Sequence, residues 1–248
     1  MAEAFRLGIE VQPPHVNMSL RSYGLFWVEQ RPVIRMGLDL VRDLHRETII
    51  ALIAQRRQRA FASVSDLAQR VPMQAKELEH LIEGGALDGL GASRGAMLGD
   101  VTRIRRAGSA QQMAFDLGEA PAVTDTISQQ VLWEKQVLGY PLRSVRLGLA
   151  QLRSLHPECV HVMRFDQQLG QRVKVLGVRL PGWGRRNQFY VWDGSGWVLA
   201  RLPEGLLTAP SWEAVELVGR AVRDRWGGMW LQTESIQRLE WGGASETA

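Results

Sequence analysis

With 248 residues, 45% of them hydrophobic and 23% charged, the chain is long enough for one large domain or two smaller ones, and we expect two. Its net charge of +4 comes mainly from arginine, which is compatible with a nucleic-acid partner and equally with an ordinary solvated surface. The single cysteine excludes an internal disulfide, and no apolar run approaches the roughly 20 residues of a membrane span, so we expect a soluble cytoplasmic protein without a membrane partner.

The first 34 residues are predicted to form short strands joined by turns, as in the apolar run Leu25–Val28. From Met36 the apolar spacing becomes helical, and residues 35–106 are predicted to form two helical hairpins in tandem. The turn of the first hairpin, residues 42–47, contains no glycine. Glycines in such a turn let backbone N–H groups approach a phosphate closely, so this bulky, charged turn argues against that contact.

Further helices are predicted at residues 63–71, from about residue 74 to 83, and from residue 93 to about 106. The first of them begins with Ser63 three residues before Asp66, a spacing typical of a capped helix start. The second ends at Gly84 and Gly85, because glycine is common just after a helix. Residues 107–125 are predicted to be a linker or exposed loop.

The second half of the chain begins with a helical connector over residues 126–157, in which one helix ends near Gly139 because Pro141 blocks its continuation. Five strand-like runs follow, at residues 172–180, 188–192, 197–202, 213–222 and 229–239. The short connecting element at residues 203–209 lies where a five-stranded OB barrel has its non-strand insertion. We therefore predict an α+β chain: a helix-hairpin-helix domain, then an OB-fold barrel over residues 158–241 and a disordered tail at 242–248.

Four short segments occur in a fixed order: Gly8–Asn17, Phe61–Leu67, Leu81–Asp88 and Trp133–Gly139. Together they resemble the C-terminal region of the bacterial DNA polymerase III alpha subunit, including its error-prone branch. The resemblance implies that residues 1–34 derive from the fingers and that the helical hairpins contact duplex DNA. It also implies that the OB domain lies near the template strand, and that the partners are single-stranded or primer-template DNA, a polymerase catalytic chain and the sliding clamp.

The clamp contact is expected to be weak. The family's clamp peptide resembles Gln-Met-Ser-Leu-Phe, and aligning Gln111 and Phe115 with its ends places Ala114 where the leucine fills a pocket. Gln111 and Phe115 remain the candidate anchors. The alternative is an exposed polar loop with one buried phenylalanine.

No catalytic constellation is recognisable. Nucleotidyl transfer by two metals needs paired carboxylates, and the sequence has no Asp-x-Asp; the family's palm would lie upstream of Met1. The chain is therefore not expected to be an enzyme on its own, and no cofactor is predicted. His156, Cys159 and His161 lie close in sequence, but Pro157 separates them and no fourth ligand is near, so we predict no metal site.

Two groups of residues are candidates for DNA binding. An OB barrel binds single strands with a basic groove and aromatic side chains on which bases stack. The barrel candidates are Lys174, Arg179, Trp183, Arg185, Arg186, Phe189 and Trp192. The hairpin candidates, whose side chains could replace the lost backbone contacts, are Arg42, His45, Arg46, Arg56 and Arg57.

Each group has an alternative. Strand alternation places Phe189 opposite Tyr190 and Trp192, so some of these rings belong to the barrel core. The hairpin arginines could simply solvate one end of the hairpin. Four further tryptophans are assigned to packing or a protein interface rather than to DNA: Trp212, Trp226, Trp230 and Trp241.

The sequence thus predicts a non-catalytic DNA-binding module that acts in DNA replication or translesion repair beside a polymerase, in the cytoplasm with the nucleoid. Two alternatives stay open. One is a protein-interaction scaffold of the replisome whose DNA sites have decayed. The other is the C-terminal part of a split DNA-directed DNA polymerase.

Overall fold

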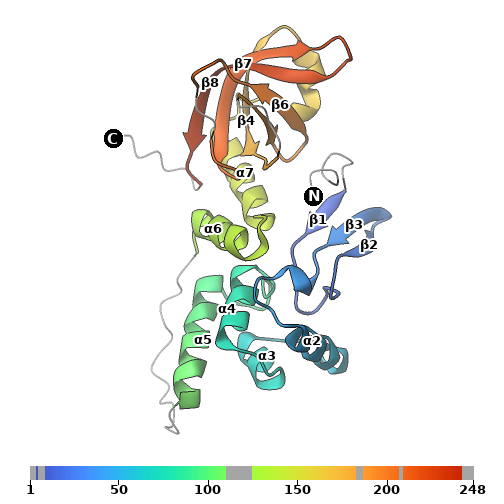
Figure 1. The fold of residues 1–248 in the computed structure, drawn as a ribbon, viewed down its shortest axis with the longest axis vertical. Helices are drawn as coiled ribbons and strands as arrows, with labels where there is room; N and C mark the ends of the chain where they lie inside the picture. The colour runs from blue at the N-terminus through green and yellow to red at the C-terminus, as the bar shows by residue number, and fades with distance from the viewer. Residues whose placement is uncertain (1–3, 5–8, 110–124, 183–186, 207–208, 242–248) are drawn as a thin grey trace. The chain divides into compact units, whose positions relative to one another are not determined.

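The computed structural model describes residue 4 and residues 9–109, 125–182, 187–206 and 209–241. It divides into two compact units, Ile9–Leu142 and a second that contains the described residues from Arg143 onward (Figure 1). No helix of the described residues is long and apolar enough to cross a membrane.

The first unit opens with a three-stranded sheet in the order β1-β3-β2. Its strands are β1 (Glu10–Gln12), β2 (Gly24–Val28) and β3 (Arg31–Arg35). β1 runs parallel to β3, and β2 pairs with β3 as an antiparallel hairpin. The hairpin turn is Glu29-Gln30, and both residues have positive φ, as in the tight turns whose twist matches that of the flanking strands. The predicted short N-terminal strands are therefore present.

The rest of the unit is helical. Its helices are η1 (Leu38–Leu40), α2 (Arg46–Gln58), α3 (Val64–Arg70), α4 (Ala75–Glu83), α5 (Arg94–Ser109) and α6 (Ile127–Leu138). The predicted capping holds: the Ser63 hydroxyl accepts the Asp66 N–H at 3.1 Å. Gly84 follows α4, and Gly139 ends α6 in the left-handed conformation with φ +76°. The helix-hairpin-helix prediction is confirmed for this unit.

The helical spacing from Met36 predicts a helix before the turn at residues 42–47, but within residues 36–41 only the 3-10 turn η1 forms. The N–H groups of Leu38 and Asp39 donate sideways to the carbonyls of Leu20 and Arg21, at 3.0 and 2.9 Å. A side chain at Gly37 would collide with the backbone of the same segment. The chain is therefore fixed against its neighbour and has no room for a longer helix.

The junction of α4, α5 and α6 is organised by Arg94, whose side chain is 2% exposed. Its guanidinium donates to Asp88 at 2.7 and 2.9 Å, to Glu134 at 2.8 Å and to the Glu83 carbonyl at 3.0 Å. Burial alone would lower the pKa of Arg94, but Asp88 and the fully buried Glu134 raise it above its ordinary value. A side chain at Gly85, which has positive φ, would collide with this guanidinium.

The second unit is a closed five-stranded barrel with the strand order β4-β5-β6-β8-β7. Its strands are β4 (Arg172–Arg179), β5 (Gln188–Trp192), β6 (Trp197–Arg201), β7 (Ala214–Arg223) and β8 (Met229–Leu239). β6 and β8 are parallel, all other pairs are antiparallel, and the pairing of β4 with β7 closes the barrel. The predicted OB-like barrel and its five strands are confirmed, with boundaries within two residues.

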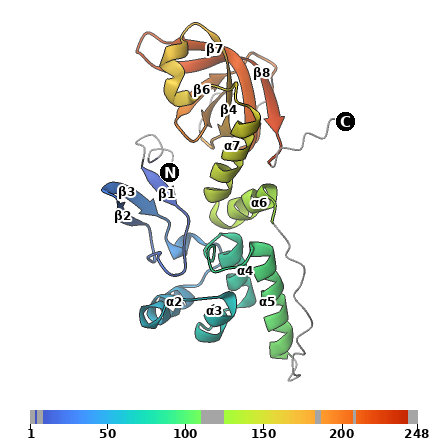
Figure 2. The ribbon, with the colours of Figure 1, turned by 180° about the vertical axis from the view of Figure 1, so that it is seen from behind.

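Two helices complete this unit, α7 (Arg143–Leu155) and η2 (Val162–Gln168). α7 packs against β4, and η2 contacts β4, β6 and β7 (Figure 2). The barrel core contains Phe165 of η2 together with inward-facing strand residues such as Val175, Val191, Leu217 and Leu231. At Gly219 the pairing of β7 with β8 shifts register, and a side chain there would collide with the Gln232 backbone.

Asp193 fixes the turn between β5 and β6 and is 4% exposed. One of its carboxylate oxygens accepts the N–H groups of Ser195 and Gly196, at 2.8 and 2.9 Å. The other accepts the Val162 N–H at 2.9 Å and the guanidinium of Arg153 at 3.1 Å. Asp193 therefore orders this turn and also attaches α7 and η2 to the barrel.

Candidate nucleic-acid interface

The outer face of β5, β6 and β8 carries aromatic side chains at neighbouring positions. Tyr190 of β5 pairs with Leu199 of β6, which in turn pairs with Trp230 of β8. Tyr190 is exposed, and its ring meets that of Trp197 edge to face, with centroids 4.8 Å apart. Because successive strand residues point to opposite faces, all of these side chains lie outside the barrel.

Arg201 adds positive charge to this face. Its guanidinium carbon lies 4.2 Å from the centroid of the Trp230 ring, which is within the range of a cation–π contact. The Nε atom of Arg201 is buried and has no hydrogen-bond partner among the described residues. We call the set Tyr190, Trp197, Leu199, Arg201 and Trp230 the aromatic face.

The loop between β7 and β8 presents a further ring. Trp226 is 81% exposed, and the guanidinium carbon of Arg225 lies 4.7 Å from its ring centroid. Asp224 orders the loop, because its carboxylate accepts the N–H groups of Trp226 and Gly228, each at 2.8 Å. In OB folds this loop, the loop between the first two strands, and the face of the second and third strands are the usual sites of oligonucleotide binding.

Burial corrects the expectation for two predicted rings. Phe189 is 3% exposed because it points into the barrel core. Trp192 points outward but is 5% exposed, with Arg146 of α7 5.8 Å from its ring centroid. Neither ring is available to stack on a base. Trp183, Arg185 and Arg186 lie outside the described residues.

The two basic residues predicted on β4 are engaged within the protein. Lys174 lies 3.2 Å from a Glu158 oxygen and 3.4 Å from a Glu216 oxygen, and these contacts raise the pKa of its ammonium group. Arg179 donates to the carbonyl of Ala209. Both side chains therefore already have partners within the barrel, and a DNA contact would compete with these partners.

The turn of the first hairpin contains a residue in the left-handed conformation that glycine usually adopts, although the turn has no glycine. Asp43 has φ +57°, in the left-handed region that aspartate tolerates better than most residues. Arg42, His45, Arg46 and Arg57 are exposed. Arg56 is half-buried and donates to the Val16 carbonyl at 2.9 Å, so its role is structural.

A carboxylate already occupies the N-terminus of α2. His45 is the N-cap of α2, and its N–H donates to Glu77 at 3.0 Å. The same carboxylate accepts the Gln74 N–H at 2.8 Å and bonds Thr48. Burial alone would raise the pKa of Glu77, but these hydrogen bonds outweigh it and hold the pKa below its usual value. A helix N-terminus is where a phosphate would be expected to bind, and here Glu77 fills that place.

We expect Asp43→Gly to stabilise the protein by about 0.5–1 kcal/mol, because glycine adopts positive φ without steric strain. The larger entropy that glycine loses on folding offsets only part of this gain. Asp43 lies 3.7 Å from His80 and 3.9 Å from Arg42, and contacts this exposed contribute little. Urea denaturation measures the change. Asp43→Ala is the matched control and should be less stable than wild type; equal stability of the two variants would contradict the assignment of backbone strain to this position.

Comparisons with known proteins agree with the predicted resemblance. Residues 8–97 match the family of the helix-hairpin-helix motif. DNA polymerase III subunit alpha of Helicobacter pylori is 31% identical over 150 residues, which cover 55% of this chain and 12% of that protein. The error-prone DNA polymerase of Pseudomonas syringae pv. tomato is 29% identical over 197 residues, or 73% of this chain and 19% of that protein. The chain thus spans less than a fifth of the length of either relative.

Solved structures show weaker likenesses. The hypothetical protein ygiW from E. coli has a TM-score of 0.29 and 15% identity, and the match covers 33% of this chain and 89% of that one. The telomere capping protein Ten1 from Saccharomyces pombe has a TM-score of 0.27 and 18% identity, with 33% and 79% covered.

Proposed function

We propose, from the relatedness of this chain to the C-terminal region of the DNA polymerase III alpha subunit and the error-prone DNA polymerase, that it is a non-catalytic DNA-binding module. It acts beside a polymerase in DNA replication or translesion repair. The observation that carries the proposal is the aromatic face of the barrel, with Arg201 stacked on Trp230. This face differs from the predicted set, since it moves the contact from β4 and the following loop to β5, β6 and β8.

The chemistry of this face fits single-stranded DNA. Every base has a π-face, so exposed rings bind bases without regard to sequence, and each stack contributes about 1–3 kcal/mol. Tyr190 and Trp230 lie on either side of β6, while Trp226 and Arg225 extend the surface at the β7–β8 loop. The two arginines supply charge for the phosphates, and their cation–π contacts keep the guanidinium groups beside the rings.

The helical hairpins of the first unit are proposed to contribute less to DNA binding than the barrel. Its turn holds exposed Arg42 and Arg46, but Glu77 fills the backbone position that would receive a phosphate. We therefore assign the main DNA contact to the barrel. Sliding-clamp binding through Gln111 and Phe115 remains a prediction, because both residues lie outside the described part of the chain.

A second candidate, a protein-interaction scaffold, is favoured by the surface of the small sheet. Leu25 and Trp27 alternate along β2, so they lie on the same face, and they are 62% and 69% exposed. Apolar side chains of this size at neighbouring exposed positions are typical of a protein contact. Co-purification with polymerase subunits in the absence of any DNA binding would favour this candidate over the first.

The DNA-binding proposal is tested by measuring oligonucleotide affinity across a salt series. Affinity for a single strand should fall with salt, with a log-log slope of about −0.7 for each phosphate contacted. Replacing both Arg201 and Arg225 by methionine should make the slope less steep by about 1.4. Arg164→Met, at an exposed position on η2, is the matched control and should leave the slope unchanged. Absence of binding even at low salt would sink the proposal.

A further inference from the structure

A tight turn after α7 places a histidine and a cysteine side by side. The helix ends at Leu155, and the N–H of Cys159 donates to the carbonyl of His156 at 3.2 Å. Pro157 occupies the second position of this turn, where its fixed φ favours the turn conformation. The proline that separates the two residues in sequence therefore brings their side chains together.

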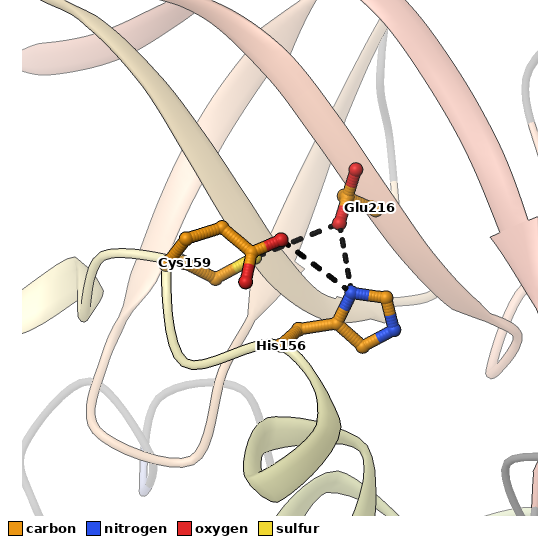
Figure 3. A group of neighbouring side chains, drawn as sticks. His156, Cys159 and Glu216 are labelled. Carbon is orange, nitrogen blue, oxygen red and sulfur yellow. Dashed lines mark hydrogen bonds and ion pairs between the residues drawn. The ribbon is translucent and has the colours of Figure 1, made fainter.

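Strand β7 contributes a third group from 57 residues farther along the chain. One oxygen of Glu216, Oε2, lies 3.1 Å from His156 Nδ1 and 3.7 Å from Cys159 Sγ (Figure 3). A Glu158 oxygen lies 3.8 Å from the same histidine nitrogen. The ligand atoms of these four residues all lie within 4.8 Å of one another.

These distances resemble those around a tetrahedral metal ion. Zn²⁺ binds nitrogen and oxygen at about 2.0–2.2 Å and sulfur at about 2.3 Å, so its ligand atoms are about 3.3–3.6 Å from one another. The nitrogen-to-oxygen and sulfur-to-oxygen distances here, 3.1 and 3.7 Å, bracket that range. The Glu158 oxygen lies farther out, 3.8 Å from His156 and 3.2 Å from Lys174, so it would turn from the ammonium group toward the ion to complete the site.

The surrounding charges also favour a dication. The second oxygen of Glu216, Oε1, faces the Lys174 ammonium at 3.4 Å, which leaves Oε2 directed at His156 and Cys159. Burial, with the nearby Glu216 and Glu158 carboxylates, raises the pKa of the Cys159 thiol to about 12. A bound metal ion would favour the thiolate over the thiol. The thiolate, the two carboxylates and the Lys174 ammonium together carry a net charge of −2, which a dication neutralises.

We propose that His156, Cys159 and Glu216, with Glu158 as the fourth ligand, form a Zn²⁺ site on the barrel. The donor set of one thiolate, one imidazole and carboxylates suits zinc, whereas magnesium and calcium prefer oxygen alone. The ion would tie the turn after α7 to β7. His161, the third residue of the sequence cluster, does not belong to the site, because its ring lies 3.7 Å from Asp193.

Titration of the chelator-treated full chain with Co²⁺ tests the site directly. Cys159 is the only cysteine, so a sulfur-to-cobalt charge-transfer band reports on this thiol alone, and Zn²⁺ should displace the cobalt and abolish the band. Absence of the band at saturating cobalt would overturn the proposal.

Variants that keep the thiol assign the other ligands. His156→Gln and Glu216→Gln should each weaken Co²⁺ binding at least about 100-fold. The matched controls are His161→Gln and Glu234→Gln, which change the same residue types outside the cluster and should bind as wild type. Zn²⁺ should also protect Cys159 of the wild type from a thiol-alkylating reagent. Equal affinity of the His156 and His161 variants, or no protection by Zn²⁺, would contradict the site.

Discussion

Replacing Trp197 and Trp230 together by alanine should weaken binding of a single-stranded oligonucleotide by about 2–6 kcal/mol, on the order of 30-fold to 20,000-fold. Each ring offers a platform for one base, and Trp230 also supports the guanidinium of Arg201. Both rings lie outside the barrel core but are half-buried, so circular dichroism of the variant has to show a folded barrel before the affinities are compared. Fluorescence anisotropy with a labelled oligonucleotide, at constant salt, measures the loss.

Two controls separate stacking from general effects. Trp27→Ala removes an equally large exposed ring from β2 of the first unit and should leave the affinity unchanged. The double variant should also keep most of the salt slope of the wild type, because lost stacking releases no counterions. A loss of affinity of less than threefold would show that the aromatic face is not part of the DNA-binding surface.

Arg94→Met should lower the free energy of unfolding of the first unit by about 3–5 kcal/mol, because it removes the cation that the buried Glu134 and the partly buried Asp88 share. Asp88 and Glu134 both accept hydrogen bonds from this guanidinium, and Glu134 is fully buried. Methionine retains much of the apolar volume, so the effect reports the lost charge. Denaturation followed by far-ultraviolet circular dichroism measures it.

A second substitution tests the cause. Arg94→Met combined with Glu134→Leu should recover part of the loss, since it removes the buried carboxylate together with the guanidinium that faces it. Arg59 provides a control on the surface: it pairs with Asp66 at 2.7 Å but is itself exposed, and solvent screens such pairs, so Arg59→Met should have a small effect. A cost of the Arg94 substitution below about 1 kcal/mol would show that the junction does not depend on this cluster.

The secondary structure was largely predictable because its signals are local. The five barrel strands follow from alternation and from turn residues such as Asp193, and the helix starts follow from caps such as Ser63. The helix expected at residues 36–41 failed for a reason that lies elsewhere in the chain. Its first N–H groups bond to Leu20 and Arg21, and no local pattern announces that contact.

The candidate sites depend on contacts between distant residues, which single-sequence patterns do not contain. Alternation placed Phe189 opposite Tyr190 but left open which of the two faced inward. Arg201 and Trp230 were missed because the pairing of β6 with β8 decides that they stack, although the outward positions of the third and fifth strands could have suggested them. Likewise, Glu216 joins His156 and Cys159 only through the closure of the barrel, which places β7 beside the turn.

The difference between the closed barrel and the open sheet bears on how the protein behaves at high concentration. Every described barrel strand has two neighbours, so the barrel has no edge strand to offer to another molecule. β2 is an outer strand of its sheet, and it combines free backbone groups with the apolar side chains of Leu25 and Trp27. Self-association by strand pairing would therefore begin at β2, and a lysine in place of Leu25 is the substitution that would best keep concentrated samples monomeric.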